Sequence, residues 1–131
     1  MATTVALTLA FGLAACQSQS SINRNPHSGA ITATMQNGIQ TVVVTTGDNY
    51  RFNPSTITVH PGTVRITLEH KGNGAPHDWQ LDGFPAARVP VINPGQSKSI
   101  DFVAPAPGRY TFICSIHLKQ GQTGTLVVLP N

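Results

Sequence analysis

The chain has 131 residues, which leaves room for one domain. Only 10% of the residues are charged, and the eight Lys and Arg side chains behind the net charge of +3 form no basic run. Nucleic-acid binding is therefore not expected.

The first 15 residues are largely apolar and uncharged, and the run from Val5 to Ala15 is too short to span a bilayer. It ends in Leu13-Ala14-Ala15-Cys16, which resembles a bacterial lipobox, where the cysteine is lipidated and becomes the mature amino terminus. We therefore expect residues 1–15 to be a lipoprotein signal peptide. Cys16 would anchor the exported protein in the bacterial cell envelope, on its periplasmic or extracellular face. An ordinary signal peptide cut nearby is the alternative.

Residues 17–38 are rich in Gln, Ser, Asn, Gly and Thr and have no sustained periodicity. This composition is typical of a flexible segment. We expect residues 16–39 to be the lipidated cysteine and its tether, followed by one folded domain over residues 40–131.

Short apolar alternations broken by Pro and Gly begin at Thr41 and predict an all-β sandwich or barrel of about eight strands. The stretch from Gly83 to Asn93 is less regular and is expected to hold a loop or a single helical turn. The predicted strands are 41–46, 50–52, 56–60, 63–70, 77–82, 97–103, 108–114 and 123–129.

The stretch from Cys114 to Gln122 places a thiol, the imidazole of His117 and the amide oxygen of Gln122 at spacings that let one loop surround a metal ion. A second imidazole, His77, stands at the start of a separate alternating run. Two His, one Cys and a weak axial oxygen make a mononuclear copper site of the electron-transfer type. Taken singly, Cys114 could be a core thiol and Gln122 an ordinary loop residue.

Other residues near these strands have simpler explanations. His60 precedes a Pro-Gly turn and is expected to be exposed. His70 is expected to face solvent or the loop at Lys71. Trp79 should leave its strand on the same face as His77 and pack in the core.

The chain resembles the cupredoxins, the small type 1 blue copper proteins of the plastocyanin and azurin kind, over roughly residues 40–130. Family members usually carry methionine where this chain has Gln122, which is similar to the glutamine of stellacyanin-like members. The matching motifs are Phe52-Asn53-Pro54, Pro61-Gly62, Pro76-His77, Pro94-Gly95-Gln96, Pro107-Gly108-Arg109-Tyr110 running into Cys114, His117, and Gly124-Thr125-Leu126-Val127-Val128.

The resemblance implies a Greek-key fold and one copper ion per chain that cycles between Cu(I) and Cu(II). It also implies that Asp78 stands where the family often has asparagine, directly after His77, which Pro76 precedes, and that Asp78 pairs with Ser115 to tie the ligand-bearing strands together. An exposed Asp78 at a strand end is the alternative. Electrons would leave through the edge of His117, within a surface formed by Ala75, Pro76 and Leu118.

These features predict a monomeric, membrane-tethered one-electron carrier between exported redox proteins, and not an enzyme. A copper-binding or copper-delivery protein without redox turnover is the alternative. Copper enzymes need further copper sites, and a binuclear copper domain needs a second cysteine near Cys114, which the sequence lacks.

Overall fold

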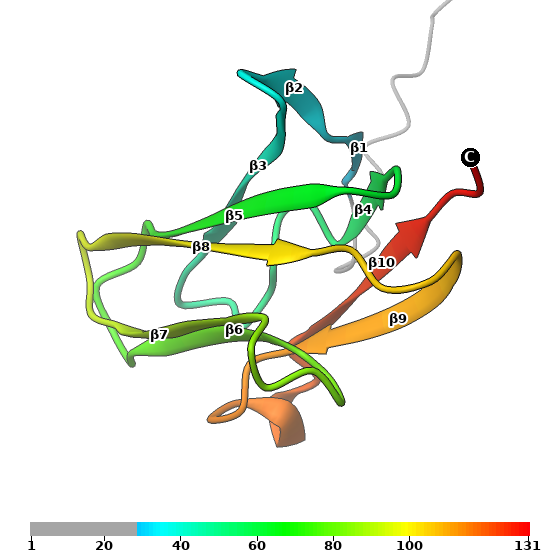
Figure 1. The fold of residues 1–131 in the computed structure, drawn as a ribbon. Helices are drawn as coiled ribbons and strands as arrows, with labels where there is room; N and C mark the ends of the chain where they lie inside the picture. The colour runs from blue at the N-terminus through cyan, green and yellow to red at the C-terminus, as the bar shows by residue number, and fades with distance from the viewer. Residues whose placement is uncertain (1–28) are drawn as a thin grey trace, which may run out of the picture.

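The computed structural model describes residues 29–131, which form two β-sheets and one short 3-10 helix (Figure 1). The larger sheet has six strands in the order β1-β4-β10-β9-β6-β7, and the smaller has four in the order β2-β3-β5-β8. The elements are β1 (Ala30–Thr32), β2 (Thr34–Gln36), β3 (Ile39–Thr46), β4 (Thr56–Val59), β5 (Thr63–His70), β6 (His77–Leu81), β7 (Arg88–Ile92), β8 (Ser97–Val103), β9 (Gly108–Ile113), η1 (Leu118–Gln120) and β10 (Thr123–Val128). The predicted all-β class is confirmed. No helix among these residues has the length and apolar character needed to cross a bilayer.

The chain moves between the two sheets in its first half. β3 and β5 pair in parallel in the smaller sheet, and the intervening β4 pairs in parallel with β10 in the larger one. β6 and β9 are antiparallel neighbours, with Gln80 opposite Ile113 and Leu81 opposite Phe112. Because β9 runs toward the beginning of β6, the loop that follows Ile113 comes alongside His77. This pairing brings two distant parts of the sequence to one end of the molecule.

The core lies between the sheets and follows the alternation of the strands. In β5, Val64, Ile66 and Leu68 are fully buried while the residues between them are at least partly exposed. Trp79 is fully buried and packs on the ring of Phe112, with centroids 5.3 Å apart. The predicted core position of Trp79 is therefore confirmed. A period of two with one buried face is what an antiparallel or mixed sandwich requires.

Two predicted features of the strand pattern were wrong. Residues 50–52 are not a strand, because Tyr50 has a φ of +54° and the chain makes only an isolated bridge from Asn53 to Thr45. The stretch 83–93 contains a real strand, β7, although Pro90 lies inside it. β7 pairs only with β6 at the edge of its sheet, and an edge strand tolerates a proline that lacks an N–H donor.

The predicted tether also ends earlier than expected. β1 and β2 lie within the segment 16–39, and β3 begins at Ile39. All six side chains of β1 and β2 are exposed, so these strands have no buried face that an apolar alternation could reveal. Their place is set by backbone pairing, β1 with β4 and β2 with β3. The predicted signal peptide, Cys16 and the rest of the tether through residue 28 lie outside the described residues.

Candidate metal centre

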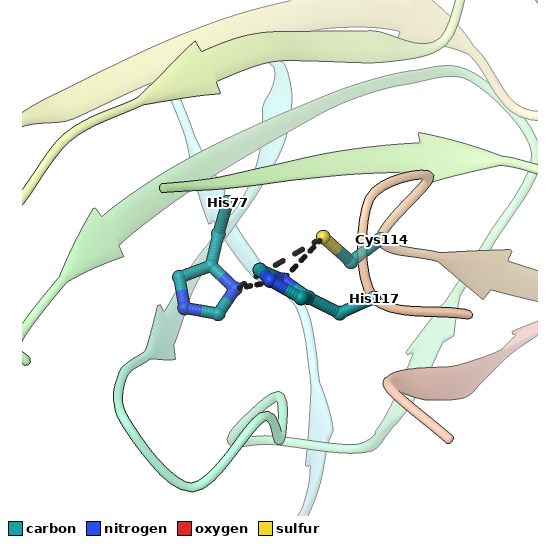
Figure 2. A group of neighbouring side chains, drawn as sticks. All are labelled: His77, Cys114 and His117. Carbon is teal, nitrogen blue, oxygen red and sulfur yellow. Dashed lines mark hydrogen bonds between the residues drawn. The ribbon is translucent and has the colours of Figure 1, made fainter. Parts of the chain in front are cut away.

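The predicted ligand residues come from three elements at one end of the sandwich. His77 is the first residue of β6, Cys114 follows the last residue of β9, and His117 and Gln122 flank η1 before β10 begins. His77, Cys114 and Gln122 are fully buried, and His117 is only 5% exposed. Figure 2 shows His77, Cys114 and His117 pointing toward one another. The end of the sheet is therefore closed over a group of donor atoms, with one imidazole nearest the surface.

The three donors are close enough to share one ion. The Nδ1 atoms of His77 and His117 are 3.2 Å apart, and the Cys114 Sγ lies 4.0 Å from the first and 3.6 Å from the second. Two donors bound to one ion at about 2.0–2.3 Å cannot lie more than about 4.6 Å apart, and all three distances satisfy this limit. Two imidazoles and a thiol in this arrangement fit the donor set of a trigonal copper site.

Hydrogen bonds within the loop set the positions of Cys114 and His117. The His117 N–H donates to the Cys114 carbonyl at 3.3 Å, and the Cys114 N–H donates to the Gln122 carbonyl at 3.0 Å. Gly121 closes the turn after η1 with a φ of +75°, which a residue with a side chain rarely adopts. These features, all within the loop's own sequence, set part of its shape.

Gln122 presents its amide oxygen to the cluster. Its Oε1 lies 2.8 Å from His77 Nδ1, and its Nε2 donates to the Thr46 hydroxyl at 2.6 Å. Because Thr46 takes the nitrogen end of the amide, the oxygen end is the one left for the cluster. Thr46, the last residue of β3, was missed by the sequence analysis, since 76 residues separate it from Gln122.

Burial controls the protonation of the two most enclosed donors. It lowers the pKa of His77 below its ordinary value of 6.5, an effect that the hydrogen bond to Gln122 opposes. Burial raises the pKa of the Cys114 thiol above its ordinary value of 9.0. His77 is thus favoured as the neutral imidazole that a metal needs. Cys114 would have to release a proton when a metal binds.

The predicted contact between Asp78 and Ser115 is present. The Asp78 carboxylate is fully buried and accepts hydrogen bonds from the Ser115 N–H at 2.7 Å and the Ser115 hydroxyl at 2.6 Å. The alternative of an exposed Asp78 is wrong. Arg88 of β7, which the sequence analysis missed, donates to the same carboxylate at 3.0 Å and balances its charge.

The two remaining imidazoles of the domain differ from each other. His60 is exposed, as predicted. His70 was expected to face solvent or the loop at Lys71, and the solvent-facing alternative is wrong, because His70 is 2% exposed and bonds to that loop through Gly72. Its Nε2 donates to the Ala75 carbonyl at 2.8 Å and its Nδ1 accepts from the Gly72 N–H at 3.1 Å, so the loop before His77 folds back over the end of β5. Its ring packs edge-on against His77, with centroids 4.8 Å apart.

Two exposed apolar side chains flank His117 in the chain. Leu118 and Ile116 are 51% and 45% exposed and lie directly after and before His117 in the chain. Ala75 and Pro76, which precede His77, are partly buried. This is the surface on which the sequence analysis placed electron exit, and Ile116 extends it.

The comparisons with known proteins agree with this structure. Residues 4–128 match the model of the cupredoxin-like domain family. A stretch of 42 residues, 30% of the chain, is 45% identical to auracyanin-B of Chloroflexus aurantiacus, and it spans only 18% of that protein.

Two solved structures illustrate the fold. Reduced auracyanin from Roseiflexus castenholzii matches with a TM-score of 0.63 and 24% identity, over 69% of this chain and 97% of that one. The metal-binding domain of a Cu(I)-exporting P-type ATPase from Streptococcus pneumoniae D39 matches with a TM-score of 0.63 and 22% identity, over 76% and 95%. The match to the family model covers nearly the whole sequence, and the chain therefore belongs to the cupredoxin-like domain family.

Proposed function

We propose that this protein is a one-electron carrier that holds one copper ion between His77, Cys114 and His117, with the Gln122 amide oxygen as a weak axial ligand. The observation that carries the proposal is the buried cluster of two imidazole nitrogens and one thiol within 4.8 Å of one another. Soft thiolate and imidazole donors with a weak axial oxygen suit copper in both of its oxidation states.

The chain's own residues would supply rigidity and exclude water. Bound copper would contribute a Cu(I)/Cu(II) couple. The loop hydrogen bonds hold Cys114 and His117, and Asp78 fixes the loop to β6 through Ser115. A site that changes little between oxidation states exchanges electrons with little rearrangement, which supports a carrier without a substrate of its own.

The apolar surface around His117 would receive the redox partners. His117 is the most exposed of the four proposed ligands, and Leu118 and Ile116 beside it are open to solvent. Together with Ala75 and Pro76 they form a small surface, as suits transient electron-transfer complexes. We expect a monomer that meets a donor and an acceptor in turn at this surface.

Copper delivery without redox turnover is the competing function, and the fold does not exclude it, since a domain of a copper-exporting ATPase shares it. The copper-loaded domain should show an intense visible absorption and a reversible one-electron wave in voltammetry. It should also keep its copper in the presence of a metal-free acceptor domain. Rapid transfer of copper to that acceptor, without a reversible wave, would support delivery and overturn the carrier function.

We propose further that the carrier is exported and anchored to the cell envelope through a lipid on Cys16. The support is the lipobox-like Leu13-Ala14-Ala15-Cys16, and the signal peptide would then be residues 1–15. Mass spectrometry of the protein from its native membrane should give a mature chain that begins at a lipidated Cys16. An unmodified chain that begins after Cys16 would contradict the anchor.

A further inference from the structure

A loop that includes residues 50–52, which were predicted to be a strand, packs against the proposed ligands. It joins β3 to β4 and turns sharply, with the Tyr50 N–H donating to the Gly47 carbonyl at 3.1 Å. The Tyr50 ring lies on His117, with centroids 4.7 Å apart and planes tilted by 54°, and it lies 6.0 Å from the ring of His77. The ring of Tyr50 therefore covers the ligand nearest the surface.

The backbone of Tyr50 is in an unusual conformation for a residue with a large side chain. Its φ of +54° is in the left-handed region, which costs energy for any residue except glycine. Such conformations persist when the surrounding contacts require them, and they often occur at functional sites. Here the conformation directs the ring of Tyr50 onto His117.

The next residue joins this loop to the ligand loop. Arg51 Nη1 donates to the Tyr50 carbonyl at 2.9 Å and to the Gln120 carbonyl at 2.8 Å. Gln120 ends η1, between His117 and Gln122. The hydrogen bonds of the Gln120 and Gly121 N–H groups are local and reach only His117 and Leu118, whereas Arg51 adds a bond across 69 residues of sequence.

We propose that Tyr50 and Arg51 are positioning residues that hold the stretch His117–Gln122 in its ligand geometry in the metal-free protein, and that they slow the loss of copper once it is bound. Arg51 fixes the backbone of this stretch through Gln120, and Tyr50 restricts the ring of His117. Neither residue contributes an atom to the ligand cluster. The copper-retention half rests on the proposed function, whereas the ordering of the loop does not.

Hydrogen exchange of the metal-free protein tests the ordering half. In Arg51→Gln, the amides of Gln120, Gly121 and Gln122 should exchange about tenfold faster than in the wild type, because the backbone they belong to loses a charge-assisted hydrogen bond. The matched control is Arg65→Gln. Arg65 lies near the start of β5, five positions before His70, and its guanidinium donates two hydrogen bonds to Asp101 of β8.

The comparison with the control separates local from global effects. Amides in β5 and β9 should keep their rates in both variants, which shows that the whole fold has not been weakened. Equal exchange of the three loop amides in Arg51→Gln and Arg65→Gln would overturn the positioning role of Arg51, whatever the copper measurements give.

Copper extraction tests the retention half. Because φ of Tyr50 is positive, Tyr50→Gly removes the ring without straining the backbone, and Tyr50→Phe keeps the ring. Transfer of Cu(I) from the reduced protein to bathocuproine disulfonate should be about tenfold faster for Tyr50→Gly and Arg51→Gln, and unchanged for Tyr50→Phe and Arg65→Gln. Equal rates of Cu(I) transfer in the wild type and the four variants would overturn the retention half. A wild type that forms no coloured copper complex would refute the proposed function and the retention half with it, while the exchange experiment would still decide the ordering of the loop.

Discussion

Two pairs of aspartate and arginine lie in different surroundings of the same protein. Asp78 and Arg88 lie next to the ligand loop, where the carboxylate is fully buried, whereas Asp101 and Arg65 lie on the outer face of the smaller sheet with side chains about 40% exposed. The surface pair is the shorter one, at 2.6 Å against 3.0 Å. We nevertheless expect the surface pair to contribute less to the free energy of unfolding, because water can replace either of its two partners.

The pair at the ligand loop differs in its carboxylate alone, because Asp78 is fully buried while Arg88 is 46% exposed. Asp78 binds both polar groups of Ser115 and so joins β6 to the residue after Cys114. A buried charge is tolerated only when it is paired and hydrogen-bonded. At the ligand end of the sandwich the Asp78 carboxylate therefore depends on its protein partners, whereas water can reach both members of the pair on the outer face.

The largest effect is expected at the centre of the ligand end. Cys114→Ser should abolish the visible absorption of the copper-loaded protein, because the thiolate supplies the charge-transfer band. An optical spectrum with Cu(II) bound is the measurement. An intense visible band that persists in Cys114→Ser would mean that the ligand assignment is wrong.

The comparison between the two pairs can be tested directly by removing each carboxylate. Asp78→Ala should lower the free energy of unfolding of the metal-free protein by about 3 kcal/mol, since it removes the two hydrogen bonds from Ser115 to a charged, fully buried carboxylate. Asp101→Ala should move the midpoint of urea unfolding only slightly, because Arg65 stays hydrated. Equal losses in the two variants would show that burial does not separate the pairs.

Gln122 gives a smaller effect on the proposed copper couple. Its amide oxygen is a harder donor than a thioether and should favour Cu(II), so that Gln122→Met raises the potential. A loss of about 2 kcal/mol of this preference corresponds to a rise of roughly 90 mV, at about 59 mV for each tenfold change. Voltammetry of both proteins measures this. An unchanged or lower potential would make Gln122 a loop residue and not the axial ligand.

The smallest effect concerns the pH dependence of stability in the metal-free protein. Because the pKa of His77 is lowered from 6.5 in the folded state, the unfolded chain binds more protons just below pH 6.5. The free energy of unfolding is therefore highest, as far as His77 is concerned, above pH 6.5, and it decreases as the pH falls toward the folded pKa of His77. Denaturant unfolding at several pH values should show this decrease in the wild type and in the exposed control His60→Asn, and a weaker one in His77→Asn. If the free energy of unfolding depended on pH in the same way in all three proteins, the burial effect on His77 would be contradicted.

Much of the fold follows from local patterns. The alternation in β3, β5, β8 and β10 predicted strands close to those observed, because each has one face that packs against the other sheet. β7 was not predicted because Pro90 interrupts its pattern. β1 and β2 were not predicted because neither has a buried face. Sequence patterns report burial, so strands that form by backbone pairing at an edge leave little signal.

The sequence by itself determined the chemistry of the candidate site. Cys114, His117 and Gln122 share one short loop, so their types and spacing already indicated a metal-binding loop, and His77 completed the set. Only the tertiary structure decided what surrounds that loop. Thr46 orients the amide of Gln122, Arg51 binds the backbone at Gln120, and His70 is buried against His77. These contacts join residues from different strand ends. They depend on how the two sheets pack, and no short-range spacing in the chain encodes that packing.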